Sequence, residues 1–457
     1  MVVSGFDHGW EGEPVITTNS AWDTKNAALG KTPIYVFAIG GRAKVYTTHN
    51  LLAYGITGYP TYLATLKTPR GASQSIDVVN GSSSIGELEC EVVEYQGDLL
   101  GLVGTTTLDG LTATLSVGYP GMAYANFVAL TTYQIYKVIP SKNYTSWLFK
   151  SRDRQMNQKK TIWTHPENGL ALDDSNPWIL QGTPCEIVQA IHLFALGRAV
   201  AELDRTTFLA LDSAVENLHA TLRPFYFVLD KSFEAKEFLE SQIYKCCGVY
   251  PVVDNVGRLS LRAFRSPMAG PTPLYTFDED NMTILPEVDR MPIINEIVFK
   301  IDADASDYKN ELVFADATSL SLYGRTTKLS IDSAGLKTVL GAQWWCEEVA
   351  SRIFRRFSGS TNGLRGGAPV FTIEAFFLTA PVWVGDFVYL THPSMPDILT
   401  GTMGVTNRLV EVISRDPDYA QGKMKYKLLD TGMTSLQAAH LFSSSARNFV
   451  IGTSEVF

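Results

Sequence analysis

The sequence predicts a β-rich α+β protein in which two β-barrel or β-sandwich modules flank a mixed α+β middle region. Two long stretches contain short strand-like runs separated by Gly and Pro, helical patterns lie between them, and one amphipathic helix occurs in the last third. A chain of 457 residues has room for roughly three domains with cores of their own. The segments that we predict are an N-terminal arm (1–32), a first β domain (33–140), an α+β middle domain (141–270), a second β domain (271–432) and a C-terminal arm (433–457).

The first β domain is predicted from runs of β-branched and aromatic residues with turn residues between them. These runs cover 33–39, 43–48, 62–66, 75–79, 86–95, 112–117 and 131–139. Their number and spacing favour one barrel or sandwich.

The middle domain is predicted to contain three helices followed by a hairpin. Gly248 stands where the third helix should end in a left-handed turn. The helical patterns cover 186–203, 207–218 and 233–247, and the hairpin strands cover 249–253 and 258–264.

The second β domain carries the clearest helix of the sequence, predicted over 335–357. Ser333 is a suitable N-cap, and Gly359 lies where the helix should stop. Its apolar stripe consists of Val339, Ala342, Cys346, Val349, Ile353 and Phe357. Because a helix with one apolar face must lie on an apolar surface, we expect it to pack on the surrounding strands. Those strands are predicted at 297–301, 370–378, 386–391, 405–413 and 423–429.

Composition restricts the function classes. Hydrophobic residues make up 45% and charged residues 19% of the chain, as in globular proteins. The net charge of −9 opposes tight non-specific binding to duplex DNA. No apolar run approaches the roughly 20 residues that span a bilayer, and no targeting segment is evident, so we expect synthesis and folding in the cytoplasm. Five scattered cysteines favour reduced thiols.

An acidic strand is the first candidate site. Glu87, Glu89 and Glu91 share one face of the run 86–95, with neighbouring carboxylates about 6.6–7 Å apart, within the range for an inverting glycosidase pair. Catalysis would need one carboxyl with a raised pKa in a desolvated pocket, whereas three glutamates in a row keep one another hydrated. We therefore favour a solvated face, with an acidic channel wall second and catalysis last.

Cysteine and histidine patterns predict no metal or cofactor. Cys246 and Cys247 invite a metal or iron–sulfur site with Cys185, but adjacent cysteines point about 100° apart on a helix and no Cys-x-x-Cys spacing accompanies them. Buried thiols are the favoured interpretation. No phosphate-binding loop, nucleophile elbow or His-Glu-x-x-His motif is present, so no catalytic residue is assigned.

A basic, aromatic stretch spans 147–163. Five cations alternate there with aromatic rings, a composition that can bind single-stranded nucleic acid by stacking and charge. A solvated interdomain loop or a subunit contact is the favoured alternative. The residues are Lys150, Arg152, Arg154, Lys159 and Lys160 with Trp147, Phe149 and Trp163.

A subunit interface is predicted on the charged side of the 335–357 helix. Trp344 projects away from the apolar stripe, near Arg355, with Arg352 on the same charged face. An exposed Trp in such a setting commonly anchors a partner. We therefore predict that Trp344, Arg352 and Arg355 belong to a subunit contact.

Three stretches carry a resemblance to a known family. They are 111–140 (LTATLSVGYPGMAYANFVALTTYQIYKVIP), 225–264 with FLESQIYKCCGVYPVVDNVGRLSLRAF, and 295–430 with SLSLYGRTTKLSIDSAGL before the helix and WVGDFVYLTHPS after it. Together they resemble the tail hub proteins of tailed bacteriophages, the central baseplate hub or tail-tip hub family. Some members carry cell-wall hydrolase domains or cysteine clusters for iron–sulfur binding, and this sequence shows neither.

The resemblance implies a homotrimer at the tail tip or baseplate of a virion. Two tube-like β modules per subunit, here 33–140 and 293–432, would alternate into a pseudo-sixfold ring that adapts a sixfold tail tube to a threefold tip. The implied partners are a distal tail or tail-tube protein above, tip, fibre or central spike proteins below, and phage DNA that passes through the channel without specific binding. In such a ring, Glu87, Glu89 and Glu91 are candidates for a channel-facing strand.

Two alternatives stay open from the sequence. One is a cell-wall polysaccharide hydrolase, which depends on the glutamate strand alone and should lose turnover when Glu89 is changed. The other is a β-rich receptor-binding tip protein, which should show a shallow aromatic groove. A hub should show neither property and should form rings.

Overall fold

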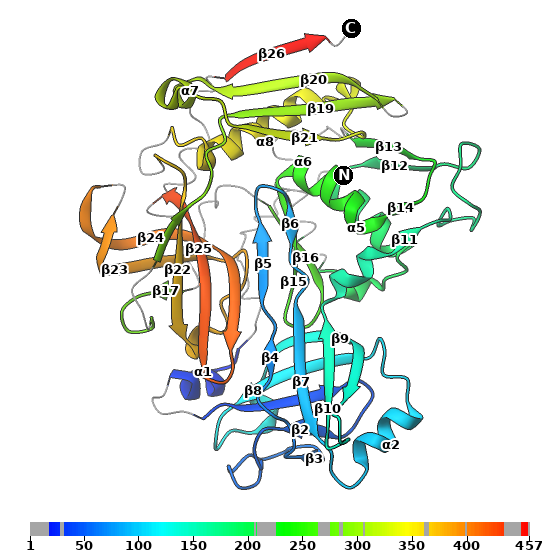
Figure 1. The fold of residues 1–457 in the computed structure, drawn as a ribbon, viewed down its shortest axis with the longest axis vertical. Helices are drawn as coiled ribbons and strands as arrows, with labels where there is room; N and C mark the ends of the chain where they lie inside the picture. The colour runs from blue at the N-terminus through cyan, green and yellow to red at the C-terminus, as the bar shows by residue number, and fades with distance from the viewer. Residues whose placement is uncertain are drawn as a thin grey trace, which may run out of the picture.

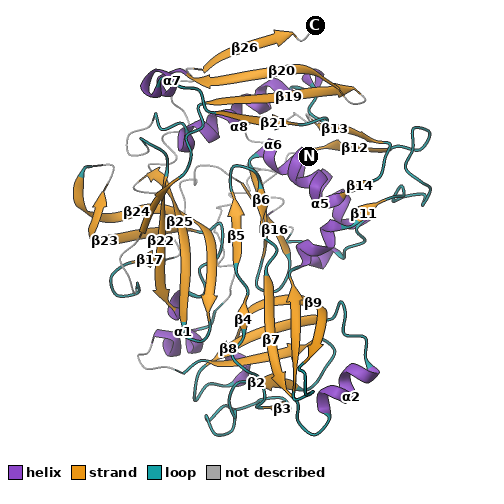
Figure 2. Cartoon of the chain, in the orientation of Figure 1, coloured by secondary structure: helices purple, strands orange, loops and turns teal. Residues whose placement is uncertain are grey.

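The structure, a computed structural model, describes residues 18–27, 32–204, 207, 225–263, 275–282, 287–304, 307–360, 365–397, 400–433 and 449–455. Strands dominate these residues, and most helices are short (Figure 2). The predicted β-rich α+β class is confirmed.

The first large sheet has the order β3-β2-β1-β8-β9-β10-β7-β4 and curls on itself in the lower part of Figure 1. Its strands are β1 (Ile34–Ile39), β2 (Val45–Thr47), β3 (Tyr62–Leu63), β4 (Arg70–Gly71), β7 (Glu87–Val93), β8 (Thr112–Gly118), β9 (Val128–Pro140) and β10 (Ser146–Arg152). All the runs predicted between 33 and 140 form strands, and all but 75–79 belong to this sheet.

Strand β10 lies beyond the predicted boundary at residue 140, yet it is an interior strand between β9 and β7. The prediction of a solvated loop is therefore wrong for 146–152. The basic composition conceals a two-residue period, in which Trp147 and Phe149 point into the core while Lys150 and Arg152 lie on the other face.

The second large sheet has the order β17-β23-β24-β25-β22-β18. Its strands are β17 (Thr276–Phe277), β18 (Glu287–Arg290), β22 (Pro369–Phe376), β23 (Phe387–Asp397), β24 (Thr402–Asp418) and β25 (Lys423–Met433). A strand from the other end of the chain joins it: β5 (Gln74–Asp77) pairs with β24, with Ser75 opposite Ser414, and continues into β6 (Ser82–Ser83). The predicted strand at 75–79 thus connects the two large sheets (Figure 1).

A third sheet with the order β21-β19-β20-β26 lies at the top of Figure 1. Its strands are β19 (Glu296–Asp304), β20 (Asp307–Asp316), β21 (Lys328–Asp332) and β26 (Phe449–Glu455), and α7 (Ala317–Tyr323) follows β20. The long helix α8 (Ala342–Phe357) packs against β19 and β20. The predicted packing is confirmed for the strand at 297–301, which lies in β19, whereas β20 was not among the predicted strands. The predicted strand at 297–301 belongs to this sheet, whereas the strands after α8 form the second one.

Helix α8 begins later than the sequence predicts. Gly341 adopts a left-handed conformation (φ 88°) before Ala342, and Thr338–Leu340 form a separate 3-10 turn in which Val339 is 91% exposed. The Ser333 hydroxyl donates to the Gln242 carbonyl instead of capping the helix. The predicted end is close, because Gly359 takes φ 68° just after the last turn.

The middle region contains helices, two-stranded ribbons and the predicted hairpin. Its helices are α3 (Pro184–Ala190), α5 (Ala235–Phe238) and α6 (Lys245–Cys247), with π-helical turns at Ile191–Ala195 and Leu239–Tyr244 and 3-10 turns at Arg154–Lys159 and Val200–Glu202. The strands are β11 (Thr161–Ile162), β12 (Trp178–Gly182), β13 (Phe225–Leu229), β14 (Phe233–Glu234), β15 (Val249–Val253) and β16 (Leu259–Ala263). Gly248 ends α6 with φ 60°, as predicted. Apart from Thr207, the helix predicted at 207–218 lies outside the described residues.

The described part of the predicted N-terminal arm packs on its own chain. Helix α1 (Ser20–Ala27) buries Trp22, and the Asn26 amide donates to the Leu378 carbonyl at 3.1 Å. Of the predicted C-terminal arm, β26 pairs with β20, and residues 434–448 lie outside the described part. The remaining short elements are α2 (Asp98–Thr105) and 3-10 turns at Tyr124–Asn126 and Phe377–Thr379. No helix among the described residues is long and apolar enough to cross a membrane.

Candidate functional site

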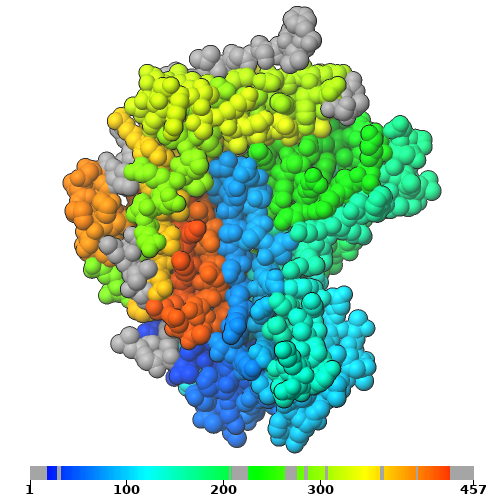
Figure 3. All heavy atoms as spheres, viewed as in Figure 1, coloured from blue at the N-terminus to red at the C-terminus, as the bar shows by residue number. Residues whose placement is uncertain are grey.

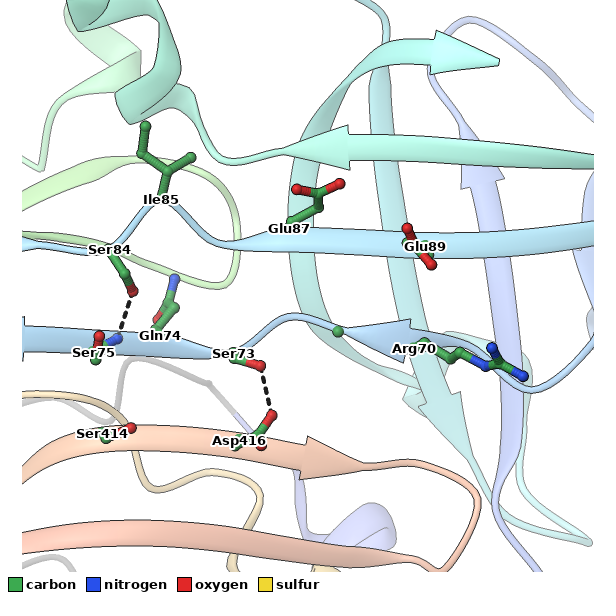
Figure 4. Close-up of a pocket in the computed structure, with 11 residues that line it drawn as sticks. Arg70, Ser73, Gln74, Ser75, Ser84, Ile85, Glu87, Glu89, Ser414 and Asp416 are labelled. Atoms are coloured by element: carbon green, nitrogen blue, oxygen red, sulfur yellow. Dashed lines mark hydrogen bonds between the residues drawn. The ribbon is translucent and has the colours of Figure 1, made fainter. Parts of the chain in front are cut away.

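The candidate site is a cleft of about 540 Å³ at the place where the first sheet meets the second. Strands β4 and β7 supply one wall and β24 the other, with β5 between them (Figure 4). The lining residues are Arg70, Gly71, Ser73, Gln74, Ser75, Ser84, Ile85, Glu87, Glu89, Ser414 and Asp416. The cleft therefore includes two of the three glutamates that the sequence singles out.

The glutamate face of β7 is formed as predicted. Glu87, Glu89 and Glu91 alternate along the strand with fully buried apolar residues. The neighbouring strand β10 places Arg152 directly opposite Glu87 and Lys150 directly opposite Glu89. Cross-strand neighbours on one face are close enough to interact, so the basic stretch and the acidic strand neutralise each other.

Each carboxylate on this face has a cation beside it. Arg152 Nη2 lies 3.3 Å from Glu87 Oε2, and Lys150 pairs with Glu89. Lys67 Nζ lies 2.5 Å from Glu91 Oε1. Three glutamates thus meet three cations, and the face is balanced in charge. The position of this face beside a channel stays a prediction. Because the three glutamates are paired with cations, they do not by themselves make an acidic wall that repels DNA.

The pKa values on this face oppose glycosidase chemistry. Burial alone would raise the pKa of Glu87, but the Tyr136 hydroxyl, which donates to Glu87 at 2.6 Å, and the Arg152 guanidinium outweigh it, so the pKa lies below its usual value. Hydrogen bonds from Lys67 and Ser146 lower the pKa of Glu91. A general acid needs a raised pKa, and these two carboxyls are shifted the other way.

The cleft is polar, and a side-chain hydrogen bond crosses it beside the backbone pairing of β5 with β24. The Ser73 hydroxyl donates to Asp416 Oδ1 at 2.5 Å (Figure 4). Among the described residues that line the cleft none is aromatic. The cleft does not match the shallow aromatic groove expected of a receptor-binding protein.

The basic, aromatic stretch is dispersed by the fold. Trp147 and Phe149 are buried in the core, and Arg154 forms an ion pair with Glu202 at 2.7 Å. Of its three aromatic residues, only Trp163 keeps an exposed ring. A stacking platform for single-stranded nucleic acid requires several exposed rings along one groove, so this part of the chain does not provide one.

The three predicted interface residues all lie on α8 but differ in accessibility. Trp344 is 54% exposed, as predicted. Arg352 Nε donates to Glu348 Oε1 at 3.1 Å, and its side chain is only 11% exposed. Arg355 is half-buried. The assignment of these three residues to a subunit contact stays a prediction. Trp344 is the most exposed of the three.

A buried polar junction that sequence reasoning missed connects three parts of the chain. Glu411 of β24 accepts hydrogen bonds from Arg356 of α8 and from the Tyr250 hydroxyl of β15, and all three side chains are buried. The sequence contains a signal for this junction. Arg356 follows Ala342 and Val349 at steps of seven residues, so it falls inside the apolar stripe of the helix. A cation inside such a stripe predicts a buried carboxylate partner.

The cysteines are buried, as favoured from the sequence. Burial raises the pKa of the Cys246 thiol to about 12 and moves those of Cys247 and Cys346 well above the usual range. Within the described ranges, no three His, Cys, Asp or Glu side chains are grouped so that they could hold a metal ion. Protonated thiols in an apolar core are weak ligands and weak nucleophiles.

The chain is similar in structure to tail proteins, two of them from prophages, and to a chain of a PdpA–VgrG complex. The 43 kDa tail protein of prophage MuSo2 from Shewanella oneidensis matches with a TM-score of 0.44 and 13% identity, covering 88% of this chain and 99% of that one. A tail protein from Neisseria meningitidis MC58 matches with a TM-score of 0.45 and 10% identity, covering 89% and 99%. A chain of the Francisella PdpA–VgrG complex matches with a TM-score of 0.36 and 8% identity, covering 90% and 54%.

No protein-family model and no curated protein sequence matches this chain. Because the TM-scores lie below 0.5 and the identities are low, the function has to be argued from the residues of the chain itself.

Proposed function

We propose that this chain is a structural virion protein of a phage tail, a hub subunit that joins the tail tube to the tail tip. Three copies form a ring around the channel through which DNA is ejected. A distal tail or tail-tube protein docks above the ring, and tip, fibre or central spike proteins dock below it. The role is structural and not enzymatic.

The observation that carries the proposal is the arrangement of the two large sheets. They come from opposite ends of the sequence, lie side by side, and are joined through the pairing of β5 with β24 (Figure 1). A ring in which two β modules per subunit alternate needs such neighbouring modules held in a fixed relation. The resemblance of the stretches 111–140, 225–264 and 295–430 to tail hub proteins supports the same role.

The sheet edges suit assembly with specific neighbours. Strand β18 forms the edge of the second sheet, and all four of its residues are exposed. Charged residues on an edge strand discourage indiscriminate pairing with other strands. The edge carries the charges of Glu287, Asp289 and Arg290. It therefore suits a partner strand whose charges are complementary to these.

The chemistry of the cleft favours the structural role over the hydrolase. The pKa values of Glu87 and Glu91 are lowered, and Lys150 occupies the space between Glu87 and Glu89, with its Nζ 3.7 Å from Glu87 Oε1. A sugar ring would have to displace these ion pairs before either carboxyl could reach it. Peptidoglycan or polysaccharide turnover that disappears in Glu89→Gln would contradict the proposal.

The proposal is tested by the oligomeric state of the full chain. Analytical ultracentrifugation at micromolar concentrations should show a trimer, and electron microscopy should show rings with threefold symmetry and a central channel. A chain that stays monomeric at the highest accessible concentration contradicts the hub role. Trp344→Ala should weaken the trimer if α8 faces a neighbouring subunit, with Met403→Ala as the control because Met403 is another exposed apolar residue.

A further inference from the structure

Residues 163–174 form a protruding hairpin to which no role has been assigned above. The Leu172 amide donates to the Trp163 carbonyl at 3.0 Å, and the His165 amide donates to the Leu170 carbonyl at 2.8 Å. It lies in the teal-green projection at the right of Figures 1 and 3. We call it the tryptophan hairpin.

The tryptophan hairpin is held in shape by its own polar groups and by those of the next two residues, Ser175 and Asn176. Asp173 Oδ1 accepts hydrogen bonds from the amides of Ser175 and Asn176 at 2.9 and 3.0 Å. The Asn176 amide group donates to the Ala171 carbonyl at 2.9 Å, and the Asn168 amide group donates to Asn176 at 2.7 Å. A preformed loop loses little conformational entropy when it binds a partner.

What the hairpin leaves to solvent is apolar and acidic. Trp163 is 67% exposed and Leu170 is 62% exposed. The carboxylates of Glu167 and Asp174 are exposed, and neither has an ion-pair partner among the described residues. Because the Asn and Asp173 side chains are used within the hairpin, the remaining surface suits a partner that offers apolar contact and positive charge.

The same chain offers such a surface on its opposite side. Leu322 at the end of α7 is 46% exposed, and the exposed cations Arg325 and Lys328 follow it. Neither cation has an ion-pair partner in the described part of the chain, although Lys328 faces Glu296 across the β19–β21 pairing. Helix α7 is anchored by the Tyr323 hydroxyl, which donates to the Gly359 carbonyl at 3.0 Å. We call Leu322, Arg325 and Lys328 the basic patch.

We propose that the tryptophan hairpin of one copy docks on the basic patch of the next copy. Glu167 and Asp174 would meet Arg325 and Lys328, and the Trp163 ring would cover Leu322 or stack on the Arg325 guanidinium. The hairpin lies at the right and α7 at the upper left of Figure 1, so one molecule cannot make the contact with itself. A contact between two different surfaces on opposite sides is heterologous, and it closes into a ring when the rotation per copy allows.

This inference rests on the proposed function, since it names one contact of the ring. A stable protein interface buries about 1,200–2,000 Å² in total, more than one hairpin supplies. The hairpin contact therefore acts as an anchor within a larger interface, and its charges should make assembly sensitive to salt, because the screening length is about 8 Å at physiological ionic strength.

Cysteine cross-linking tests the contact directly in the full chain. The five native cysteines are buried, so the double variant Trp163→Cys/Leu322→Cys should form disulfides only between copies. Under mild oxidation we expect covalent dimers and closed covalent trimers on non-reducing gels. The matched control is Trp163→Cys/Met403→Cys, in which the second exposed residue lies outside the basic patch and no closed trimer should form.

Charge reversal tests the chemistry. Glu167→Lys/Asp174→Lys and Arg325→Glu/Lys328→Glu should each weaken assembly by roughly tenfold or more, and combining all four changes should restore it. The control is Glu279→Lys/Asp280→Lys, the same change of charge at exposed acidic residues elsewhere. Circular dichroism confirms that each variant is folded.

The outcomes separate this contact from the hub role. If the wild-type chain forms rings, but the cysteine pair does not cross-link and charge reversal has no effect, the contact is wrong while the hub role stands. If the wild-type chain is monomeric, both are overturned. Cross-linking into closed trimers with rescue by the fourfold charge swap establishes the contact.

Discussion

The outer face of β7 and the buried interior of the second sheet both pair carboxylates with cations, with opposite consequences for the carboxyl pKa. On β7, Glu87 and Glu91 are partly solvated and paired with cations, and the pKa of each lies below its usual value. In the interior, burial raises the pKa of Asp386 to about 6 even though Arg262 and Arg415 lie near it, and it raises that of Asp430 beside Arg408. The difference shows that pairing decides the charge state at the surface, while desolvation decides it inside.

The largest effect should come from breaking the buried junction. Arg356→Met leaves Glu411 buried without its cation, which costs about 3–5 kcal/mol of unfolding free energy because an uncompensated charge remains in the core. Urea unfolding followed by circular dichroism measures it. Adding Glu411→Leu should recover part of the loss; if the double variant is as unstable as the single one, the unpaired charge is not the cause.

The second effect concerns Asp153, which lies at the end of β10 and accepts hydrogen bonds from the amides of Gly86 and Gln155. Burial raises its pKa to about 7, above the 3.8 of an exposed aspartate. The folded protein therefore holds this proton at a pH where the unfolded chain has released it, and stability falls as the pH rises from about 4 to about 7.

Asp153→Asn removes this dependence. Between pH 4.5 and 7.5 the unfolding free energy of the variant should gain roughly 3 kcal/mol on that of the wild type. Urea titrations at four pH values check it. Glu91→Gln is the control, because the pKa of the Glu91 carboxyl is lowered and not raised. A constant difference between Asp153→Asn and wild type would show that the carboxyl is ionised throughout.

A smaller effect is expected on the outer face of β7. Lys150→Met removes the cation that pairs with Glu89 and lies near Glu87, yet solvent can take its place, so the loss should be about 0.5–1 kcal/mol. Comparison with Arg356→Met under identical conditions sharpens the contrast between the two regions. Equal losses would mean that the outer face is less solvated than its exposure indicates.

The smallest effect is the acid sensitivity of Glu91. Hydrogen bonds from Lys67 and Ser146 lower its pKa, so its contribution is present above pH 4.5, the usual value for glutamate, and is lost as the pH falls through the lower folded value. Glu91→Gln should cost less than about 1 kcal/mol at pH 7 and less still at pH 3, below the usual pKa of glutamate. Unfolding curves at the two pH values measure the difference.

Local patterns made much of the secondary structure predictable. Strands β1, β7, β8 and β9, the β15–β16 hairpin and α8 all follow from side-chain periodicity and turn residues, which act over a few positions. Strand β10 was missed because Lys150 and Arg152 mark it as basic, while the alternation that makes it a strand appears only when each residue is assigned to a face.

In the candidate site too, some features could be predicted from local patterns and others could not. The amino-acid sequence alone predicts that Glu87, Glu89 and Glu91 share one strand face and that Trp344 stands outside the apolar stripe of α8, because both follow from the geometry of a single element. Three further features arise from packing between elements: the basic stretch neutralises the glutamates, β5 joins the second sheet, and Arg356 pairs with Glu411. These contacts join residues far apart in the chain, and register and packing between elements leave no local signal.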